Sequence, residues 1–201
     1  MEVKQVLMML GLEMALKKVT TSPLVEEVSG RKKMSALAYM LRVTHRSNLA
    51  SMHAFDWAVR LNDLHFEEVR IAALLHDIAE ILMWCFAPTA MLKIKALQQQ
   101  DKTLRSNTAQ EKVLGFTLHQ LQLELSLKWN LPNLLIALMD DDNAEQQRVR
   151  NVILAVNLAR HSANGWDDAA LPDDYEDIGK LLSLQAEEVK IVVGAEEQQD
   201  A

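Results

Sequence analysis

Residues 69–87 read Val-Arg-Ile-Ala-Ala-Leu-Leu-His-Asp-Ile-Ala-Glu-Ile-Leu-Met-Trp-Cys-Phe-Ala. Beyond its first two residues, this stretch is apolar except at His76, Asp77 and Glu80. Its length and composition predict one helix that is buried on nearly every side. At about 100° per residue, the three polar side chains share one arc of that helix, which we call the polar wedge. Because unpaired polar groups are costly to bury, the wedge must face a metal ion, other side chains or an enclosed solvent pocket.

The composition predicts an all-α protein. Of the 201 residues, 49% are hydrophobic, while only 6 are glycine and 4 are proline. Long alternating runs typical of strands are missing. Because neither an internal repeat nor a linker is recognisable, we expect a single compact multi-helix domain over residues 1–197, with a disordered tail over residues 198–201.

The net charge and the cysteine content argue against several classes of protein. The net charge of −7 argues against general nucleic-acid binding, which usually needs a basic surface. Cys85 is the only cysteine and lies inside the apolar stretch, which excludes a disulfide framework and predicts a reducing, cytoplasmic location. No signal peptide is recognisable. Asp77 and Glu80 in the middle of the apolar stretch favour a buried helix over a membrane span.

Periodicity and capping signals divide the chain into helices. Ser47 and Asn48 are predicted to cap one helix, and Thr108 forms a predicted capping box with Glu111 at the start of another. We expect helices over residues 2–19, 31–46, 48–62, 67–87, 88–100, 108–128, 132–142 and 145–162, an acidic loop over 166–177, and two short helices within 178–193. The basic residues of 31–46 are interpreted as a solvated helix face, and Trp57, Trp84 and Trp129 as core residues.

Histidines and acidic residues on other predicted helices are candidate partners for the polar wedge. His53 lies on the preceding helix, His119 on a later one, and the acidic run 140–142 ends the next. Imidazoles and carboxylates bind divalent metal ions, and a bound ion can polarise a phosphoryl group or activate water. Two interpretations remain open, because His53 and His76 could instead form a hydrogen-bonded core pair without metal.

The order of these segments resembles the HDOD family, the HD-related output domain of bacterial signalling proteins. The matching stretches are residues 6–12, the helix around His53, and residues 72–78, 111–119, 127–132 and 178–189. The resemblance implies a helical bundle like that of the HD metal-dependent phosphohydrolases. Family members usually begin with a further helical section, so we expect this chain to be a short form or a fragment.

Residue by residue, the resemblance implies a metal site at His53, His76 and Asp77 for one ion of Mn, Fe, Zn, Ni or Mg. Asn157 takes the position at which catalytic HD enzymes carry a distant aspartate, and a neutral amide is a weaker ligand for hard cations. The acidic run 140–142 stands where the family commonly shows paired histidines. The further residues predicted to contact a ligand in the cleft are Glu80, His119, Asp140 and Asn157.

The incomplete ligand set predicts a non-catalytic regulatory module of bacterial signal transduction. This module would bind a signalling protein or a small phosphorylated ligand through a degenerate HD-type cleft, and homodimerisation is expected to cover an apolar face. The alternative is a metal-dependent phosphohydrolase acting on a nucleotide or cyclic nucleotide, with His119 or Arg46 on the phosphate. A nucleotide sensor that binds without hydrolysis lies between the two.

Overall fold

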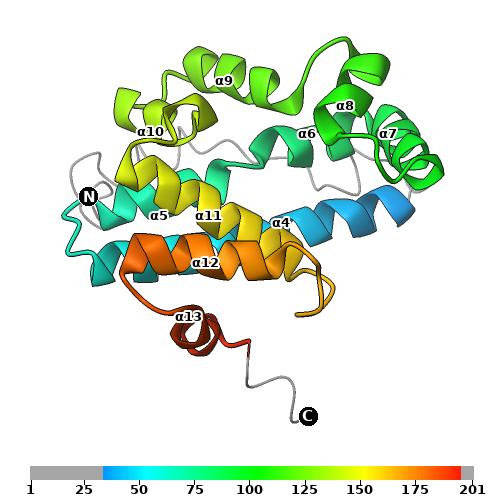
Figure 1. Cartoon of the computed structure of the whole chain (residues 1–201). Helices are drawn as coiled ribbons and strands as arrows, with labels where there is room; N and C mark the ends of the chain where they lie inside the picture. Colours follow the sequence, from blue (N-terminus) through cyan, green and yellow to red (C-terminus); the bar gives the residue numbers. More distant parts are fainter. Residues whose placement is uncertain (1–33, 196–201) are drawn as a thin grey trace. The chain divides into compact units, whose positions relative to one another are not determined.

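The computed structural model describes residues 34–195, which lie within the second of two compact units of the chain, Met34–Ala201. Its elements are α4 (Met34–Arg60), α5 (Phe66–Leu75), α6 (Ile78–Phe86), α7 (Pro88–Gln100), α8 (Ser106–Leu114), α9 (Leu118–Lys128), α10 (Asn133–Leu138), the 3₁₀ helix η1 (Asp141–Asn143), α11 (Gln147–His161), α12 (Leu171–Leu182) and α13 (Ala186–Val193) (Figure 1). Residues 34–195 contain one isolated bridge, Ala163 to Gly165, and no strand. The all-α prediction is confirmed, whereas the predictions for residues 2–19, 6–12 and 198–201 lie outside the described residues.

Helix α4 is the longest helix in the described part of the chain. Its 27 residues give it a length of about 40 Å. The helix boundary predicted at Ser47 is wrong, because the Ser47 hydroxyl donates to the Val43 carbonyl of the same helix at 3.0 Å. A hydroxyl that bonds back to its own helix does not cap a new one. The described part of the basic segment, residues 34–46, and the helix that carries His53 are therefore one continuous helix.

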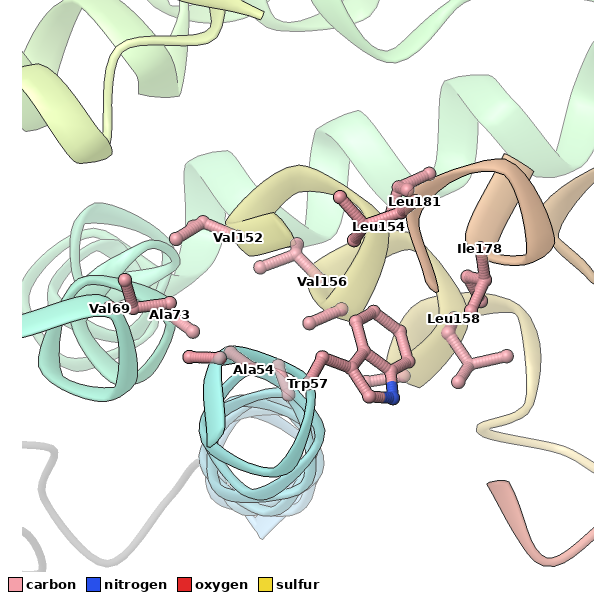
Figure 2. Close-up of a cluster of buried hydrophobic side chains, with 14 of the residues drawn as sticks. Ala54, Trp57, Val69, Ala73, Val152, Leu154, Val156, Leu158, Ile178 and Leu181 are labelled. Atoms are coloured by element: carbon pink, nitrogen blue, oxygen red, sulfur yellow. The ribbon is translucent and has the colours of Figure 1, made fainter. Parts of the chain in front are cut away.

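The main core forms where α4 packs against α5 and α11, with α12 packed on α11. Figure 2 shows Ala54 and Trp57 of α4 on the side that faces Val152 and Val156 of α11. All four side chains are buried. Alanine at a helix contact lets the backbones approach closely, and Trp57 fills the volume that remains. The helix predicted over 145–162 is confirmed as α11.

Two of the three tryptophans predicted to lie in the core do so. Trp57 is 0% exposed and Trp84 is 1% exposed, whereas Trp129 is 48% exposed. Trp129 follows the last residue of α9, so its side chain lies at a surface corner rather than on a packed helix face. Cys85 is half-buried with its sulfur 3.3 Å from that of Met40, as expected for a small apolar side chain.

The helix predicted over 67–87 is divided at His76 and Asp77 into α5 and α6. His76 keeps helical angles of φ −56° and ψ −37°, but Asp77 has φ −100° and ψ 17°. The hydrogen-bond ladder resumes when the Ile81 amide donates to the Asp77 carbonyl at 3.1 Å. The Asp77 side chain does not cap α6. The prediction of one continuous helix is therefore wrong, and the wedge begins at a turn.

Helix α7 starts at Pro88, as predicted, because proline fits the first helical turn. The axis bends by 110° between the α5–α6 segment and α7. Within the described residues, no single helix has the length and apolar composition needed to cross a membrane, although this bent pair meets the criteria jointly.

The helix predicted over 108–128 is two helices, α8 and α9, separated at Gly115. Gly115 has φ 81°, a conformation that costs glycine little and other residues more. The capping box lies after this break, where the Thr117 side chain and the Gln120 side chain bond each other's backbone amides. The box predicted at Thr108 is therefore wrong.

The acidic loop predicted over 166–177 contains the first half of α12. Asp173 and Asp174 lie in the first turn of α12, where negative charge is favourable, and a proline is also present in that turn. Asp174 Oδ2 is hydrogen-bonded to His161 Nδ1 of α11 at 2.6 Å. The loop prediction is wrong after Ala170, because these acidic residues start a helix.

Asp63, in the turn between α4 and α5, links this turn to α11. Its carboxylate accepts hydrogen bonds from Arg148 Nε at 2.6 Å and from the His65 amide at 2.8 Å. Burial alone would raise the pKa of Asp63, but these bonds lower it below its ordinary value of 3.8. Because the folded-state pKa is depressed, the ionised carboxylate stabilises the fold above the unfolded-state pKa, and this stabilisation is lost as the pH falls.

The variant Asp63→Asn is expected to lower the free energy of unfolding by about 1–2 kcal/mol near pH 7, because a charge-assisted bond becomes a neutral one. The difference from wild type should shrink as the pH falls below about 4, because the unfolded chain takes up the proton first and the folded carboxylate follows only at lower pH. Urea unfolding curves across this pH range measure it. Asp177→Asn is the control, since the Asp177 side chain is 45% exposed beside Arg150 and Lys180. That control should change stability by about 0.5 kcal/mol or less, and a pH-independent loss in Asp63→Asn would contradict the prediction.

Candidate functional site

A cleft of about 440 Å³ opens beside the turn between α5 and α6. Its walls come from α4, this turn, α6, α7, α8, α9, η1 and α11. The charged and imidazole side chains that line it are Arg46, His76, Asp77, Glu80, Lys95, His119, Asp141, Asp142 and Arg160. A volume of this size suits a small organic ligand. Charges of both signs therefore meet in a cleft of ligand size.

Arg46 of α4 joins the two carboxylates of the polar wedge. Its Nε and Nη2 atoms donate to Asp77 Oδ2 at 3.0 Å and 2.5 Å. The same Nη2 atom donates to Glu80 Oε2 at 2.9 Å. The side chains of Arg46, Asp77 and Glu80 are only 16%, 11% and 19% exposed. Charge-assisted bonds at such burial are stronger than ion pairs on an open surface.

His76 contacts acidic groups on two sides. Its Nε2 atom lies 3.1 Å from Asp141 Oδ1 of η1, which makes a hydrogen bond. Its Nδ1 atom lies 3.6 Å from Asp77 Oδ1, and among the described residues this buried nitrogen has no hydrogen-bond partner. The side chain is 10% exposed. His76 therefore keeps one ring nitrogen inside the site with its bonding capacity unused.

Burial and neighbouring charges act in opposite directions on this pair. Burial would raise the pKa of the Asp77 carboxyl, but His76, Arg46 and Arg160 hold that pKa well below its usual range. Burial would lower the pKa of His76, yet the bond to Asp141 and the proximity of Asp77 raise the pKa to about 9. At neutral pH the wedge therefore carries an imidazolium beside a carboxylate.

Glu80 is held by a second contact besides Arg46. Its Oε1 atom accepts a hydrogen bond from Trp84 Nε1 at 3.3 Å. The Trp84 ring stacks on Tyr39 of α4, with ring centroids 4.7 Å apart. Because both carboxylate oxygens of Glu80 are engaged, its orientation is fixed by packing as well as by charge.

On the opposite wall, His119 of α9 lies close to the acidic segment before η1. Its Nε2 atom is 3.8 Å from Asp140 Oδ1, beyond hydrogen-bond distance, and has no hydrogen-bond partner in the described part of the chain. Lys95 of α7 and Arg160 of α11 add positive charge to the cleft. These three side chains are the donors available to an anionic group of a ligand.

Only some of the residues predicted to form the site line the cleft. His76, Asp77, Glu80 and His119 line the cleft, whereas His53, Asp140 and Asn157 are not among its lining residues. The His53 ring stacks on Trp57 with centroids 5.7 Å apart, and burial lowers its pKa. The hydrogen-bonded pair predicted between His53 and His76 is wrong, because within residues 34–195 the His53 Nε2 atom has no hydrogen-bond partner.

The residues present do not fit a metal ion in this arrangement. Among residues 34–195, no group of three or more His, Cys, Asp or Glu side chains is arranged to hold one. The Asp77 carboxylate instead accepts two hydrogen bonds from Arg46. Asn157, which the sequence places at the fourth ligand position, is outside the cleft lining. We therefore derive no chemical step through a metal.

The sequence named Arg46 only as a phosphate contact of the alternative function and missed its bonds to Asp77 and Glu80, and it missed Lys95 and Arg160 altogether. Arg46 belongs to a basic segment that was interpreted as a solvated face, although a buried pair of carboxylates requires a cation from another helix. Arg160 follows the apolar stripe of α11 and Lys95 lies on α7, so their place in the cleft depends on helix packing. Periodicity within each helix carries no such information.

The helical fold and this cleft define the class of protein. The structure is similar to a crystal structure of the "Putative phosphohydrolase" from Shewanella amazonensis, with a TM-score of 0.57, 14% sequence identity, and coverage of 96% of this chain and 72% of that chain. At this identity the likeness shows a shared helical fold and nothing more. None of the curated proteins matches the chain.

The match to a sequence family is more specific than the similarity of fold. The family model for the HDOD domain matches residues 1–144, well over half of the chain. The chain therefore belongs to the HDOD family, as its resemblance in sequence predicted. The cleft beside His76 and Asp77 is the candidate functional site of this HDOD domain.

Proposed function

We propose that this HDOD domain is a non-catalytic module of signal transduction that binds a protein partner or a small ligand through its cleft. The observation that carries the proposal is the state of the polar wedge. His76, Asp77 and Glu80 lie on the wall of a cleft of ligand size, yet their polar groups bond Asp141, Arg46 and Trp84. A site whose acids are already paired is suited to recognition rather than to activating water.

A small phosphorylated ligand is the form of this proposal that the cleft favours. Lys95, His119 and Arg160 come from three different helices and offer donors to phosphate oxygens. A bacterial, cytoplasmic setting belongs to the proposal through the family resemblance. Homodimerisation is likewise part of the proposal.

The alternative is a metal-dependent phosphohydrolase acting on a nucleotide or cyclic nucleotide. One observation favours it, since the buried Nδ1 atom of His76 has no hydrogen-bond partner among residues 34–195. The printed name of the similar Shewanella protein also points in this direction. Against it, Asp77 is bonded to Arg46 rather than directed toward a shared ligand position.

Activity and binding assays on the full chain distinguish the two functions. With Mn²⁺ or Mg²⁺ added, we expect no p-nitrophenolate from bis(p-nitrophenyl) phosphate, no phosphate from nucleoside triphosphates and no linear product from cyclic dinucleotides. We expect the tryptophan fluorescence of the chain to change on titration with the same nucleotides. The change is expected from Trp84, one of four tryptophans, because it bonds the cleft residue Glu80. This binding should persist in chelator and weaken about tenfold or more in Arg160→Ala, which removes one charged donor.

The control for this assay is Arg70→Ala, a change of an exposed arginine on α5 that is not among the cleft residues. It should leave nucleotide binding as in wild type. Metal-dependent hydrolysis that is lost in both His76→Ala and Asp77→Asn would instead establish the phosphohydrolase.

A further inference from the structure

The carboxylates of the polar wedge are already neutralised by a side chain of the same domain. A single guanidinium, that of Arg46, donates to Asp77 Oδ2 through two nitrogens and to Glu80 Oε2 through one of them. Arg46 comes from α4, whereas both acids belong to the start of α6, 31 and 34 residues later. The contact is therefore a tertiary feature of the fold rather than a local pair along one helix.

The guanidinium occupies the oxygen atoms that a divalent ion would need. Hard cations bind carboxylate oxygens at about 2.0–2.6 Å. An ion on Asp77 Oδ2 would lie beside the guanidinium that already bonds this atom, and two positive charges repel strongly in a site with low solvent exposure. The side chains of Arg46 and Asp77 are 16% and 11% exposed, so solvent screens this repulsion only weakly. Arg46 and a divalent ion therefore compete for Asp77 Oδ2, while Asp77 Oδ1 already has Arg160 Nη2 at 3.8 Å.

A third ligand atom lies next to these carboxylates. The Nδ1 atom of His76 is 3.6 Å from Asp77 Oδ1 and has no hydrogen-bond partner among residues 34–195. The His76 side chain is 10% exposed, so this nitrogen is enclosed in the site. One imidazole nitrogen with two carboxylates is a ligand set that divalent transition metals accept.

We propose that Arg46 is a built-in counter-cation that blocks a latent divalent-metal site formed by His76, Asp77 and Glu80. The inference deepens the proposed non-catalytic function, on which it rests, because it names the side chain that would keep a divalent ion out of the cleft. With Arg46 in place, Asp77 and Glu80 bond the guanidinium and His76 bonds Asp141. This is consistent with the lack of a metal-ligating group of three in the described part of the chain. Removing the guanidinium frees Asp77 Oδ2 and Glu80 Oε2, while Arg160 stays beside Asp77 Oδ1 and Trp84 stays bonded to Glu80 Oε1.

The test is Mn²⁺ binding to the full chain and to Arg46→Gln, measured by the electron paramagnetic resonance of free Mn²⁺ and by the shift in unfolding temperature on adding Mn²⁺. Wild type should show no stoichiometric binding. Arg46→Gln should bind about one Mn²⁺ per chain at least about tenfold more tightly than wild type, with a rise in unfolding temperature that wild type lacks. If Arg46→Gln does not fold in the absence of metal, Arg46→Met, which keeps the apolar stem, takes its place.

Two controls identify the site. Arg42→Gln, one turn earlier on α4 where the guanidinium lies 5.8 Å from the Tyr39 ring, should bind Mn²⁺ as wild type does. The double variant Arg46→Gln/Asp77→Asn should lose the gain. The inference is overturned if wild type already binds one Mn²⁺ per chain, or if neither variant of Arg46 binds more tightly than wild type. Phosphate release by wild type with Mn²⁺ would overturn the proposed function separately.

Discussion

Arg46→Ala is expected to lower the free energy of unfolding by about 3–5 kcal/mol, because it removes the guanidinium that donates to two largely enclosed carboxylates. Asp77 and Glu80 are 11% and 19% exposed and each accepts a hydrogen bond from Arg46. Urea unfolding followed by circular dichroism measures the loss. The effect should exceed that of a surface ion pair several-fold, since solvent cannot replace the guanidinium fully.

Two further variants test the physical reason for this loss. Arg42→Ala removes a cation of the same helix that faces the Tyr39 ring, and should cost about 1 kcal/mol or less. Adding Asp77→Asn and Glu80→Gln to Arg46→Ala should recover part of the lost stability, because the uncompensated charges are gone. An Arg46→Ala variant as stable as Arg42→Ala would contradict the expectation.

Trp57→Ala is expected to cost about 3–5 kcal/mol through the cavity that it leaves in the main core. Trp57 is 0% exposed and belongs to the same core cluster as Leu158 and Ile178, near which Figure 2 places it. The chain offers a matched control in Trp129→Ala, since Trp129 is 48% exposed. That change should cost about 1 kcal/mol or less.

Both tryptophan variants can be compared in the same urea experiment. The dependence of unfolding free energy on urea should stay close to wild type in each, because neither change alters the surface exposed on unfolding by much. Equal losses in the two variants would mean that Trp57 does not fill the core as described.

The sequence predicted the helical class and the helices whose ends carry strong local signals. Helix α7 begins at Pro88 as predicted, and α11 matches the predicted range closely. Elsewhere tertiary contacts override local signals. The helix break predicted at Ser47 does not occur, because its hydroxyl finds an acceptor one turn earlier in α4. The break at Asp77 was not predicted, because the residue stands within an otherwise unbroken apolar run.

The candidate site could be predicted only in part. His76, Asp77, Glu80 and His119 stand out in the sequence and all line the cleft. Their partners do not stand out, since Arg46 is one of several basic residues in its segment. His53 also matches a family position, yet its ring packs on Trp57 and is not part of the cleft lining. Which polar residues meet in the site therefore depends on contacts between helices, and these cannot be read from the sequence of one helix.

The few contacts that hold α7 and α8 to the rest of the domain affect how a ligand enters and leaves the cleft. These helices pack chiefly on each other, and α7 also packs on α6. The segment enters through a sharp bend before Pro88 and leaves through the left-handed Gly115. A pair of helices attached in this way forms a cooperative unit that can detach while the main core stays folded. Because α7 and α8 supply one wall of the cleft, we expect their opening to set the residence time of a molecule held there. We also expect their amide hydrogens to exchange before those of α4 and α11.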